Sequence, residues 1–374
     1  MLTIIPINTQ ALETNMKNDV LICGDFMPGG VLYRQDSYVD NKVVEFIKQH
    51  QYSIATLECA LASDDSYLLN TPEIAIPKVV CRKKDLERLY AMGINVVSLA
   101  NNHVFDLGIE SYDRLTEELT ANNIKFFGAG HNVEEASRPV VLCMGDKRIA
   151  IYGCCLDGVP PTRLVVATKD KPGIWKASIS ELSEVIKLSR SQYDYVFVMP
   201  HGGQEHKSLP MWDCVEMSRK MVDNGADGVF WSHAHCLQPY FMYKKRPIYF
   251  GLGSLLFPDV YVFPPRSVFY PDDQFDFSLL DRCDDFPKKV DMPTLAIWSK
   301  SSRKGLGISL SFNKKILIVP KLFELAQNNI LSESKRLKSN KTFFLLWLTS
   351  LLIILPKSVY GVIRNVVYKQ LNKH

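Results

Sequence analysis

The residues of this chain best suited to catalysis are carboxylate, amide and imidazole side chains that follow short apolar runs. They are Asp25, Glu58, Asn101, Asn102, His103, His201, His233 and His235. Such side chains together are ligands for borderline divalent cations such as zinc, manganese or iron. A cation held in this way acidifies a water molecule into a nucleophile and neutralises charge on a phosphoryl oxygen. The residue types therefore indicate a metal-dependent hydrolytic site.

Each of these residues also has a structural interpretation. Asp25 follows a glycine, which is typical of a turn, and residues 101–103 are typical of a helix cap. Glu58 lies in an apolar run, where an unpaired carboxylate is costly, so it needs a cation or hydrogen-bond donors. His233 and His235 stand one residue apart at a strand end, so they point the same way and favour a ligand role. Because ligands bind at the carboxyl ends of strands in α/β sheets, we expect one shared crevice.

The elements that position these residues follow from hydrophobic periodicity. Apolar runs of strand length alternate with amphipathic stretches of helical period, which predicts a layered α/β fold. The predicted strands are residues 20–23, 54–57, 95–99, 148–152, 195–199 and 228–231, and the predicted helices are 43–50, 85–92, 110–121, 179–190 and 211–224. Gly93 and Gly225 are expected to end two of the helices.

The pattern changes after about residue 258. Residues 257–293 are rich in proline, aspartate and aromatic side chains, and we expect long loops there. The short apolar runs 306–310 and 316–319 are predicted strands that could close a sheet. We therefore expect a lead-in over residues 1–19, a main domain over 20–325 and a tail over 326–374.

The tail contains a continuous apolar run, residues 343–355, with basic residues on both sides. Lys335, Arg336, Lys338 and Lys341 precede the run, and Lys357 and Arg364 follow it. Its 13 residues are fewer than the roughly 20 that span a bilayer. The run is therefore expected to be an interfacial or re-entrant membrane anchor, or a helix buried on the main domain or on a partner.

Composition narrows the function classes. The chain is 47% hydrophobic and 22% charged, which is ordinary for a globular protein. A net charge of +4 is small for 374 residues and gives no indication of nucleic-acid binding. The nine cysteines are scattered through apolar runs and are expected to be reduced, buried thiols. The first residues lack the features of a signal peptide, so we expect a cytoplasmic location.

A series of ordered motifs resembles the CapA-type family of capsule and poly-γ-glutamate biosynthesis proteins over about residues 20 to 257. The motifs are Gly24-Asp25, Thr56-Leu57-Glu58, Leu99-Ala100-Asn101-Asn102-His103 with Asp106 and Gly108, Gly128-Ala129-Gly130-His131-Asn132 with Glu135-Ala136, His201-Gly202-Gly203-Gln204-Glu205, Ser232-His233-Ala234-His235 with Gln238-Pro239, and residues 249–257. The resemblance implies a calcineurin-like metallophosphoesterase fold, with a central β-sandwich flanked by helices, and a role in capsule or exopolymer synthesis.

The resemblance also implies roles for individual residues. The implied metal ligands are Asp25, Glu58, Asn102, His201, His233 and His235, for one or two manganese, zinc or iron ions. Glu58 would bridge two ions, and the implied catalytic set is Asp25, Glu58 and His103, with His103 as the acid that protonates a leaving oxygen. Glu205 would orient a ligand imidazole. Met27 stands where metallophosphatases usually have a histidine.

We therefore expect a hydrolase that acts on a phosphate ester of a surface polymer or its precursor at the inner face of a bacterial membrane. Other capsule-synthesis proteins are expected partners. An alternative is a non-catalytic, polymer-binding or ligase-associated accessory protein. A third is a metal-free crevice in which Trp231 and Tyr240 stack on a sugar.

Overall fold

One layer of the fold is an eight-stranded sheet. The computed structural model describes residues 19–63, 78–158, 164–312 and 316–371. Its strands in spatial order are β23 (Leu331–Glu333), β22 (Ile316–Leu325), β21 (Lys304–Phe312), β1 (Asp19–Phe26), β2 (Tyr52–Leu57), β5 (Val96–Ser98) and β6 (Lys125–Phe127), and β16 (Ser254–Leu256) also pairs with β1. Strands β1, β2, β5 and β6 are parallel, so their carboxyl ends lie along one edge. The predicted lead-in lies outside the described residues, except for Asp19.

A second, seven-stranded sheet packs against the first. Its strands in spatial order are β11 (Lys176–Ala177), β9 (Lys147–Leu156), β12 (Tyr195–Pro200), β13 (Gly228–Phe230), β15 (Arg246–Tyr249) and β14 (Tyr240–Tyr243), and β8 (Val140–Met144) also pairs with β9. Strands β9, β12, β13 and β15 are parallel. The second sheet therefore also gathers the carboxyl ends of its central strands at one edge.

Side-chain alternation along β1 shows why the predicted strands are continuously apolar. Val20 and Ile22 enter a core shared with the second sheet, whereas Leu21 and Cys23 enter a core under the helices. Successive residues of a strand point to opposite faces, and both faces of this sheet are covered. Both faces must therefore be apolar, and the period-two pattern disappears.

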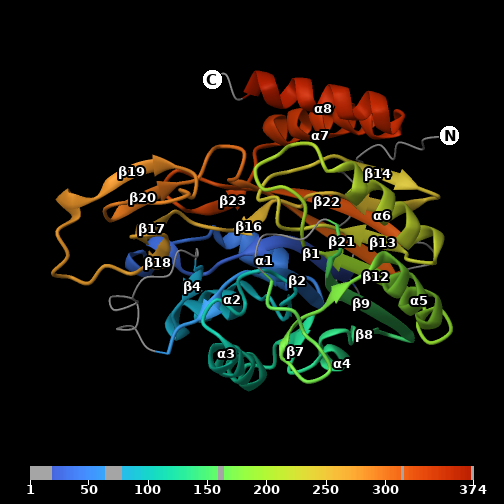
Figure 1. Cartoon of the computed structure of the whole chain (residues 1–374), viewed down its shortest axis with the longest axis horizontal. Coiled ribbons are helices and arrows are strands. Elements are labelled where there is room, and N and C mark those ends of the chain that lie inside the picture. Colours follow the sequence, from blue (N-terminus) through green and yellow to red (C-terminus); the bar gives the residue numbers. More distant parts are fainter. Residues whose placement is uncertain (1–18, 64–77, 159–163, 313–315, 372–374) are drawn as a thin grey trace.

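Helices cover the outer faces of the two sheets, which gives the expected α/β architecture of a β-sandwich flanked by helices (Figure 1). The helices are α1 (Asn41–Lys48), α2 (Lys83–Met92) and α3 (Ile109–Ala121) on the first sheet, α5 (Ile179–Ser189) and α6 (Trp212–Asp223) on the second, and the short α4 (Val133–Ala136). The Asp40 side chain caps α1 by accepting a hydrogen bond from the Lys42 N–H. Gly93 ends α2 at φ 86°, as predicted, and Gly225 follows α6. All six predicted strands and all five predicted helices are confirmed, with bounds that differ by a few residues.

The prediction of long loops over residues 257–293 is wrong. Part of this segment joins a four-stranded sheet, ordered β18 (Ser267–Phe269), β17 (Val260–Phe263), β20 (Thr294–Ile297) and β19 (Asp281–Asp284), with a 3₁₀ turn η4 (Phe277–Leu279). These strands have three or four residues each and are separated by proline and aspartate, so they are too short to show a period. Smaller pairs are β3 (Ala60–Leu61) with β4 (Val80–Cys81) and β7 (Ala129–Gly130) with β10 (Gly173–Ile174), and η2 (Gly30–Arg34) follows β1.

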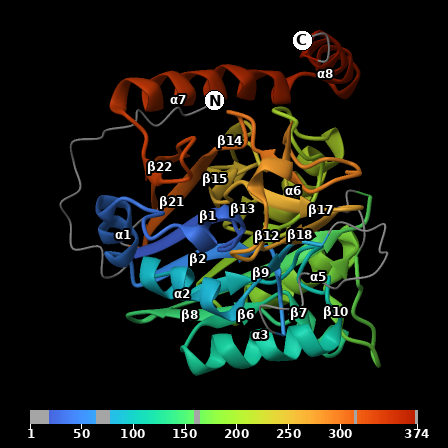
Figure 2. The same ribbon diagram turned by 90° about the vertical axis from the view of Figure 1, so that its left-hand side faces the viewer.

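The end of the chain forms α7 (Arg336–Ser350), the 3₁₀ turn η5 (Leu351–Ile354) and α8 (Lys357–Leu371). Both helices lie along the same side of the molecule (Figures 1 and 2). The predicted strands 306–310 and 316–319 are confirmed as parts of β21 and β22. Within the described residues, no helix has the length and apolarity needed to cross a membrane. The boundary between main domain and tail near residue 325 stays a prediction.

Candidate metal centre

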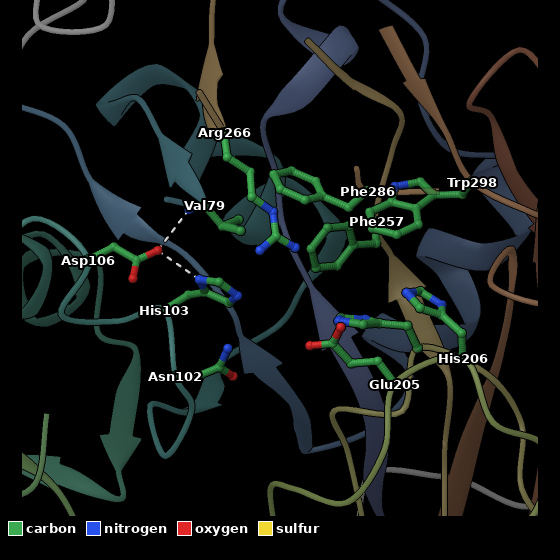
Figure 3. Close-up of a pocket in the computed structure, with 11 residues that line it drawn as sticks. Val79, Asn102, His103, Asp106, Glu205, His206, Phe257, Arg266, Phe286 and Trp298 are labelled. Carbon is green, nitrogen blue, oxygen red and sulfur yellow. Dashed lines mark hydrogen bonds and ion pairs between the residues drawn. The ribbon is translucent and has the colours of Figure 1, made fainter. Parts of the chain in front are cut away.

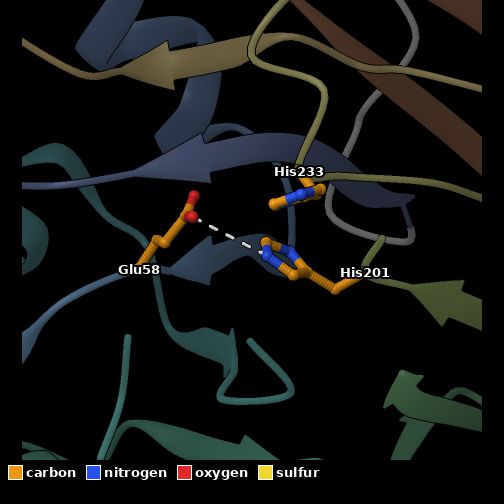
Figure 4. A group of neighbouring side chains, drawn as sticks. All are labelled: Glu58, His201 and His233. Atoms are coloured by element: carbon orange, nitrogen blue, oxygen red, sulfur yellow. Dashed lines mark ion pairs between the residues drawn. The ribbon is translucent and has the colours of Figure 1, made fainter. Parts of the chain in front are cut away.

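Glu58 lies at the centre of the candidate site, directly after β2. It is fully buried, and neither of its carboxylate oxygens has a hydrogen-bond partner among the described residues. Its Oε1 atom lies 3.7 Å from His201 Nε2 and 3.6 Å from His235 Nε2. Figure 4 shows the carboxylate facing the His201 and His233 rings. A carboxylate buried in this way is costly unless a cation compensates it.

Asp25 lies near the end of β1, one strand away from Glu58. It is fully buried, and its Oδ2 accepts a hydrogen bond of 3.1 Å from the backbone N–H of His233. The same Oδ2 lies 3.4 Å from His235 Nδ1, and Oδ1 lies 3.9 Å from His201 Nδ1. Asp25 therefore holds the histidine loop through its backbone and also faces two imidazoles.

His233 and His235 belong to the loop after β13 rather than to an extended strand end. Both have left-handed backbones, with φ 88° and 49°, which non-glycine residues seldom adopt. Both imidazoles nevertheless lie in groups with Glu58, and their ring centroids are 6.2 Å apart with planes inclined by 52°. His233 lies in a group with Glu58 and His201, whereas His235 lies in a group with Asp25 and Glu58.

His201 and Asn102 come from the two different sheets and meet at the site. His201 follows β12, and its Nδ1 contacts Ser232 Oγ at 2.9 Å while its Nε2 lies 3.0 Å from Asn102 Oδ1. Asn101 is structural, since its amide donates to the Leu57 carbonyl and its Oδ1 accepts from the backbone of His103 and Val104. The predicted helix cap is wrong, since the N-cap of α3 is Gly108; Asn101 holds a turn instead, and Asn102 faces the site.

The potential ligands form two overlapping groups. In each of Glu58–His201–His233 and Asp25–Glu58–His235, the ligand atoms lie within 4.8 Å of one another. Glu58 is the residue that belongs to both groups. The orphaned Glu58 oxygens, and His233 Nδ1, which has no partner in the described part of the chain, are what a metal centre would satisfy.

The electrostatics of the buried groups favour the binding of a cation. Burial raises the pKa of Asp25 to about 8, and burial together with the nearby Asp25 charge raises the pKa of Glu58 well above its usual value. Burial lowers the pKa of His233 to about 4 and the pKa values of His201 and His235 well below the usual value. The imidazoles are thus neutral, which is the form that binds metals. A divalent cation would return both carboxylates to their charged form.

Met27 does not contribute to the centre. It is fully buried in the core under the helices, and its sulfur accepts a hydrogen bond of 3.1 Å from the Gly29 N–H. The position where metallophosphatases usually have a histidine is therefore part of the hydrophobic core.

His103 connects the centre to a pocket beside it. Its Nδ1 donates to Asp106 Oδ2 at 2.7 Å, and its Nε2 lies 4.0 Å from Glu58 Oε1. Asp106 also accepts a hydrogen bond from the Val79 N–H at 2.8 Å, so it fixes the imidazole as well as the loop. Glu205 lies 3.7 Å from His233 Nε2, beyond hydrogen-bond distance. Glu205 therefore does not orient the His233 ring through a direct hydrogen bond.

The pocket has residues that the sequence patterns did not indicate (Figure 3). Its walls include His206, Arg266, Phe286 and Trp298, in addition to the motif residues Asn102, His103, Asp106, Glu205, His235 and Phe257. The His206 ring contacts those of His235 and Trp298, with centroids 5.9 Å and 5.7 Å away, and the centroids of His235 and Trp298 are themselves 5.9 Å apart. The one sequence signal for His206 was its position directly after the motif that begins at His201.

The alternative of a sugar stacked on Trp231 is excluded. Trp231 is fully buried, and its indole N–H donates to Ser218 Oγ at 2.8 Å in the core under α6. Tyr240 stacks on Tyr249, with ring centroids 5.0 Å apart. The accessible aromatic wall is instead the one formed by Phe257, Phe286 and Trp298.

Comparisons with known proteins were consistent over the region that contains the site. The model of the family described as bacterial capsule synthesis protein PGA_cap matches residues 19–259. The capsule biosynthesis protein CapA of Bacillus anthracis is 25% identical over 253 residues, which are 65% of this chain and 60% of that protein. The PGA biosynthesis protein CapA of Bacillus subtilis is 28% identical over 177 residues, which are 47% of this chain and 46% of that protein.

The matches cover about half to three fifths of the length of these two curated relatives. Among solved structures, a phosphatase from Mycoplasma pneumoniae aligns with a TM-score of 0.43 and 12% identity, covering 88% of this chain and 98% of that one.

Proposed function

Because the chain belongs to the bacterial capsule synthesis protein family PGA_cap, we propose that it is a metal-dependent, phosphoesterase-type hydrolase of capsule or exopolymer synthesis. The observation that carries this proposal is the environment of Glu58. Its carboxylate is fully buried and has no hydrogen-bond partner in the described residues, although Asp25 and the site imidazoles surround it. A binding protein for a neutral sugar has no need of such a costly group.

The donor set fits one or two manganese, zinc or iron ions. Asp25, Glu58 and His235 would hold one ion, and Glu58, Asn102, His201 and His233 would hold the other. Such ions, when bound, supply Lewis acidity toward a phosphoryl oxygen and lower the pKa of a water molecule. With a core methionine at position 27, the Asp25 group has three protein donors among the described residues, so we expect it to bind more weakly.

His103 is placed to handle the proton of the leaving group. Its Nδ1–H is held by the Asp106 carboxylate, so Nε2 is the atom turned toward the centre. In its protonated form, Nε2–H can donate to an oxygen that leaves the phosphorus atom. Because His103 also lines the pocket, this proton is delivered where the ester group of a substrate would lie.

The pocket supports a phosphate-linked polymer precursor as the class of substrate. Phe257, Phe286 and Trp298 offer an apolar surface beside the candidate centre, and the Arg266 guanidinium lies over the Phe286 ring at 5.3 Å. A substrate with a phosphate ester next to a ring or an apolar chain matches this combination. We place the protein on the cytoplasmic side, in a complex with other capsule-synthesis proteins.

Metal content per chain tests the proposal. Purified protein, reconstituted with manganese or zinc, should retain one or two equivalents, and the His233→Ala, His235→Ala double variant should lose them. His131→Ala is the matched control, because this imidazole is 55% exposed and bonds to Asp113 and Glu135 away from the centre. Hydrolysis of bis(4-nitrophenyl) phosphate should be abolished by a chelator and restored by the metal.

Two outcomes would decide against a hydrolase. Wild-type protein that retains no metal after reconstitution would contradict the metal centre itself. Stoichiometric metal without turnover of any phosphate ester would favour the alternative, an accessory protein that binds the growing polymer.

A further inference from the structure

The C-terminal helices expose an unusual concentration of large apolar side chains. Of the fifteen exposed residues of this kind in the described part of the chain, seven lie between residues 344 and 366. They are Phe344, Leu345, Leu348, Ile354, Val359, Val362 and Val366, with exposed fractions of 44 to 65%. Single exposed apolar residues are common, but a contiguous group indicates a binding surface.

Helix α7 shows that this exposure is not incidental. Phe343 and Leu346 face inward and pack on the core between the two sheets, whereas Phe344, Leu345 and Leu348 face outward. A helix that is apolar on all sides is normally buried on all sides. The domain covers one side of α7, and the other side stays exposed and can contact another apolar surface.

Helix α8 continues the same arrangement. Tyr360 is buried against Trp212, with ring centroids 5.2 Å apart, and its hydroxyl donates to the Pro210 carbonyl. Val359, Val362 and Val366 recur at three- and four-residue spacing, so they share one face of the helix. Figures 1 and 2 show α7 and α8 lying along the same side of the molecule, so a surface on that side can contact both helices.

The charge of this segment identifies the surface. Residues 334–374 contain no aspartate or glutamate and eight basic residues, namely Lys335, Arg336, Lys338, Lys341, Lys357, Arg364, Lys369 and Lys373. Lys338 pairs with Glu324, and Lys357 lies 3.6 Å from Asp213 and from Glu216. Lys335 and Lys341 are exposed beside the apolar residues of α7.

We propose that α7, η5 and α8 form a membrane-binding platform that rests on the headgroups of an anionic lipid bilayer. Apolar side chains flanked by lysine and arginine are the features by which interfacial helices bind such bilayers. A second copy of the chain is a poorer occupant, since a two-fold interface would bring the exposed Lys335 and Lys341 toward the same basic segment of the other copy. The inference does not depend on the metal centre.

Flotation of the full chain with vesicles tests the platform. Wild-type protein should bind vesicles of phosphatidylcholine with phosphatidylglycerol, and added salt should weaken binding. The Leu345→Ser, Leu348→Ser variant should bind at least about tenfold more weakly, because two buried contacts with lipid are lost. The control is Leu188→Ser, Leu279→Ser, which removes two leucines that are 66% and 58% exposed elsewhere.

Lys335→Gln, Lys341→Gln should also weaken binding to the anionic vesicles, whereas the control Lys288→Gln, Lys300→Gln should not. Circular dichroism of each variant checks the fold. Three results would overturn the platform: no binding of wild type, equal binding of the leucine variant and its control, or equal binding to phosphatidylcholine alone. A dimer in light scattering that Leu345→Ser, Leu348→Ser abolishes, without vesicle binding, would assign the surface to a second copy.

Discussion

The Nδ1 atom of His103 lies 2.7 Å from Asp106 Oδ2. The same carboxylate oxygen accepts the Val79 backbone N–H at 2.8 Å, so Asp106 is itself anchored. This pair fixes the tautomer and the ring plane of His103 and leaves Nε2 for a proton transfer. His103 belongs to neither group of potential metal ligands, although its Nε2 lies 4.0 Å from Glu58 Oε1.

Replacing His103 should therefore remove activity without removing metal. We expect His103→Gln to lower kcat about 10²- to 10⁴-fold, the usual contribution of a general acid. Bound metal, measured by mass spectrometry, should stay at the wild-type level. Asp106→Asn should lower kcat less, by roughly 10- to 100-fold, because the imidazole remains but loses its orientation. Loss of metal in His103→Gln would instead make His103 a ligand.

The shared position of Glu58 predicts unequal effects on metal stoichiometry. Glu58→Gln should reduce binding at both ion positions, because both groups use this carboxylate. His235→Ala should remove only the ion held with Asp25, since His201, His233 and Asn102 belong to the other position. Isothermal titration with manganese measures the number of equivalents. Two equivalents in Glu58→Gln, or none in His235→Ala, would contradict a bridging role.

The metal-free protein should become less stable as pH rises from 6.5 to 8. The pKa of Asp25 is raised from 3.8 to about 8, so the folded state holds a proton that the unfolded state releases, and stability is lost as pH rises toward 8. The lowered pKa values of His201, His233 and His235 have the opposite effect, which fades above pH 6.5 as the imidazoles of the unfolded state lose their protons. Toward pH 8, Asp25 and Glu58 therefore determine that the stability falls as pH rises.

Thermal unfolding after chelation measures this slope, which for one proton is at most about 1.4 kcal/mol per pH unit. Asp25→Asn should flatten the slope, because the amide keeps an oxygen for the His233 N–H and cannot titrate. Adding manganese should raise Tm and remove the decline, since the cation favours the charged carboxylates. A metal-free protein whose stability rises over the same range would show that these carboxylates are already compensated.

The architecture and the membership in the capsule-synthesis family were predictable from the sequence for a physical reason. Strands such as β1 and β12 are buried on both faces, so they appear as apolar runs, and Asp25 and His201 stand out as the polar residues at their ends. Parallel pairing then brings those ends together. The length of the strands, their burial and their parallel topology all favour the same arrangement, so the local sequence is sufficient to predict it.

Other features depend on tertiary contacts, which the hydrophobic periodicity of the sequence does not reveal. His233 and His235 have left-handed backbones and lie in different ligand groups, and their residue type does not indicate this conformation. Trp298 reaches the pocket from a sheet whose strands are only three or four residues long. The separate roles of Asn101 and Asn102 follow from tertiary hydrogen bonds, since Asn101 bonds to the backbone of Leu57, His103 and Val104, whereas Asn102 contacts His201.

The aromatic wall of the pocket should determine selectivity among phosphate esters. Phe286→Ala removes a ring that lines the pocket, and it should lower kcat/KM for bis(4-nitrophenyl) phosphate by up to about tenfold, the scale of one aromatic contact. Methyl 4-nitrophenyl phosphate has one aromatic ring fewer and should be affected less. Phe263→Ala is the control, because this ring at the end of β17 is 38% exposed and does not line the pocket. Equal losses for both esters would show that Phe286 supports the fold of the pocket rather than contacting the substrate, whereas a loss confined to the larger ester would place its second ring against this wall.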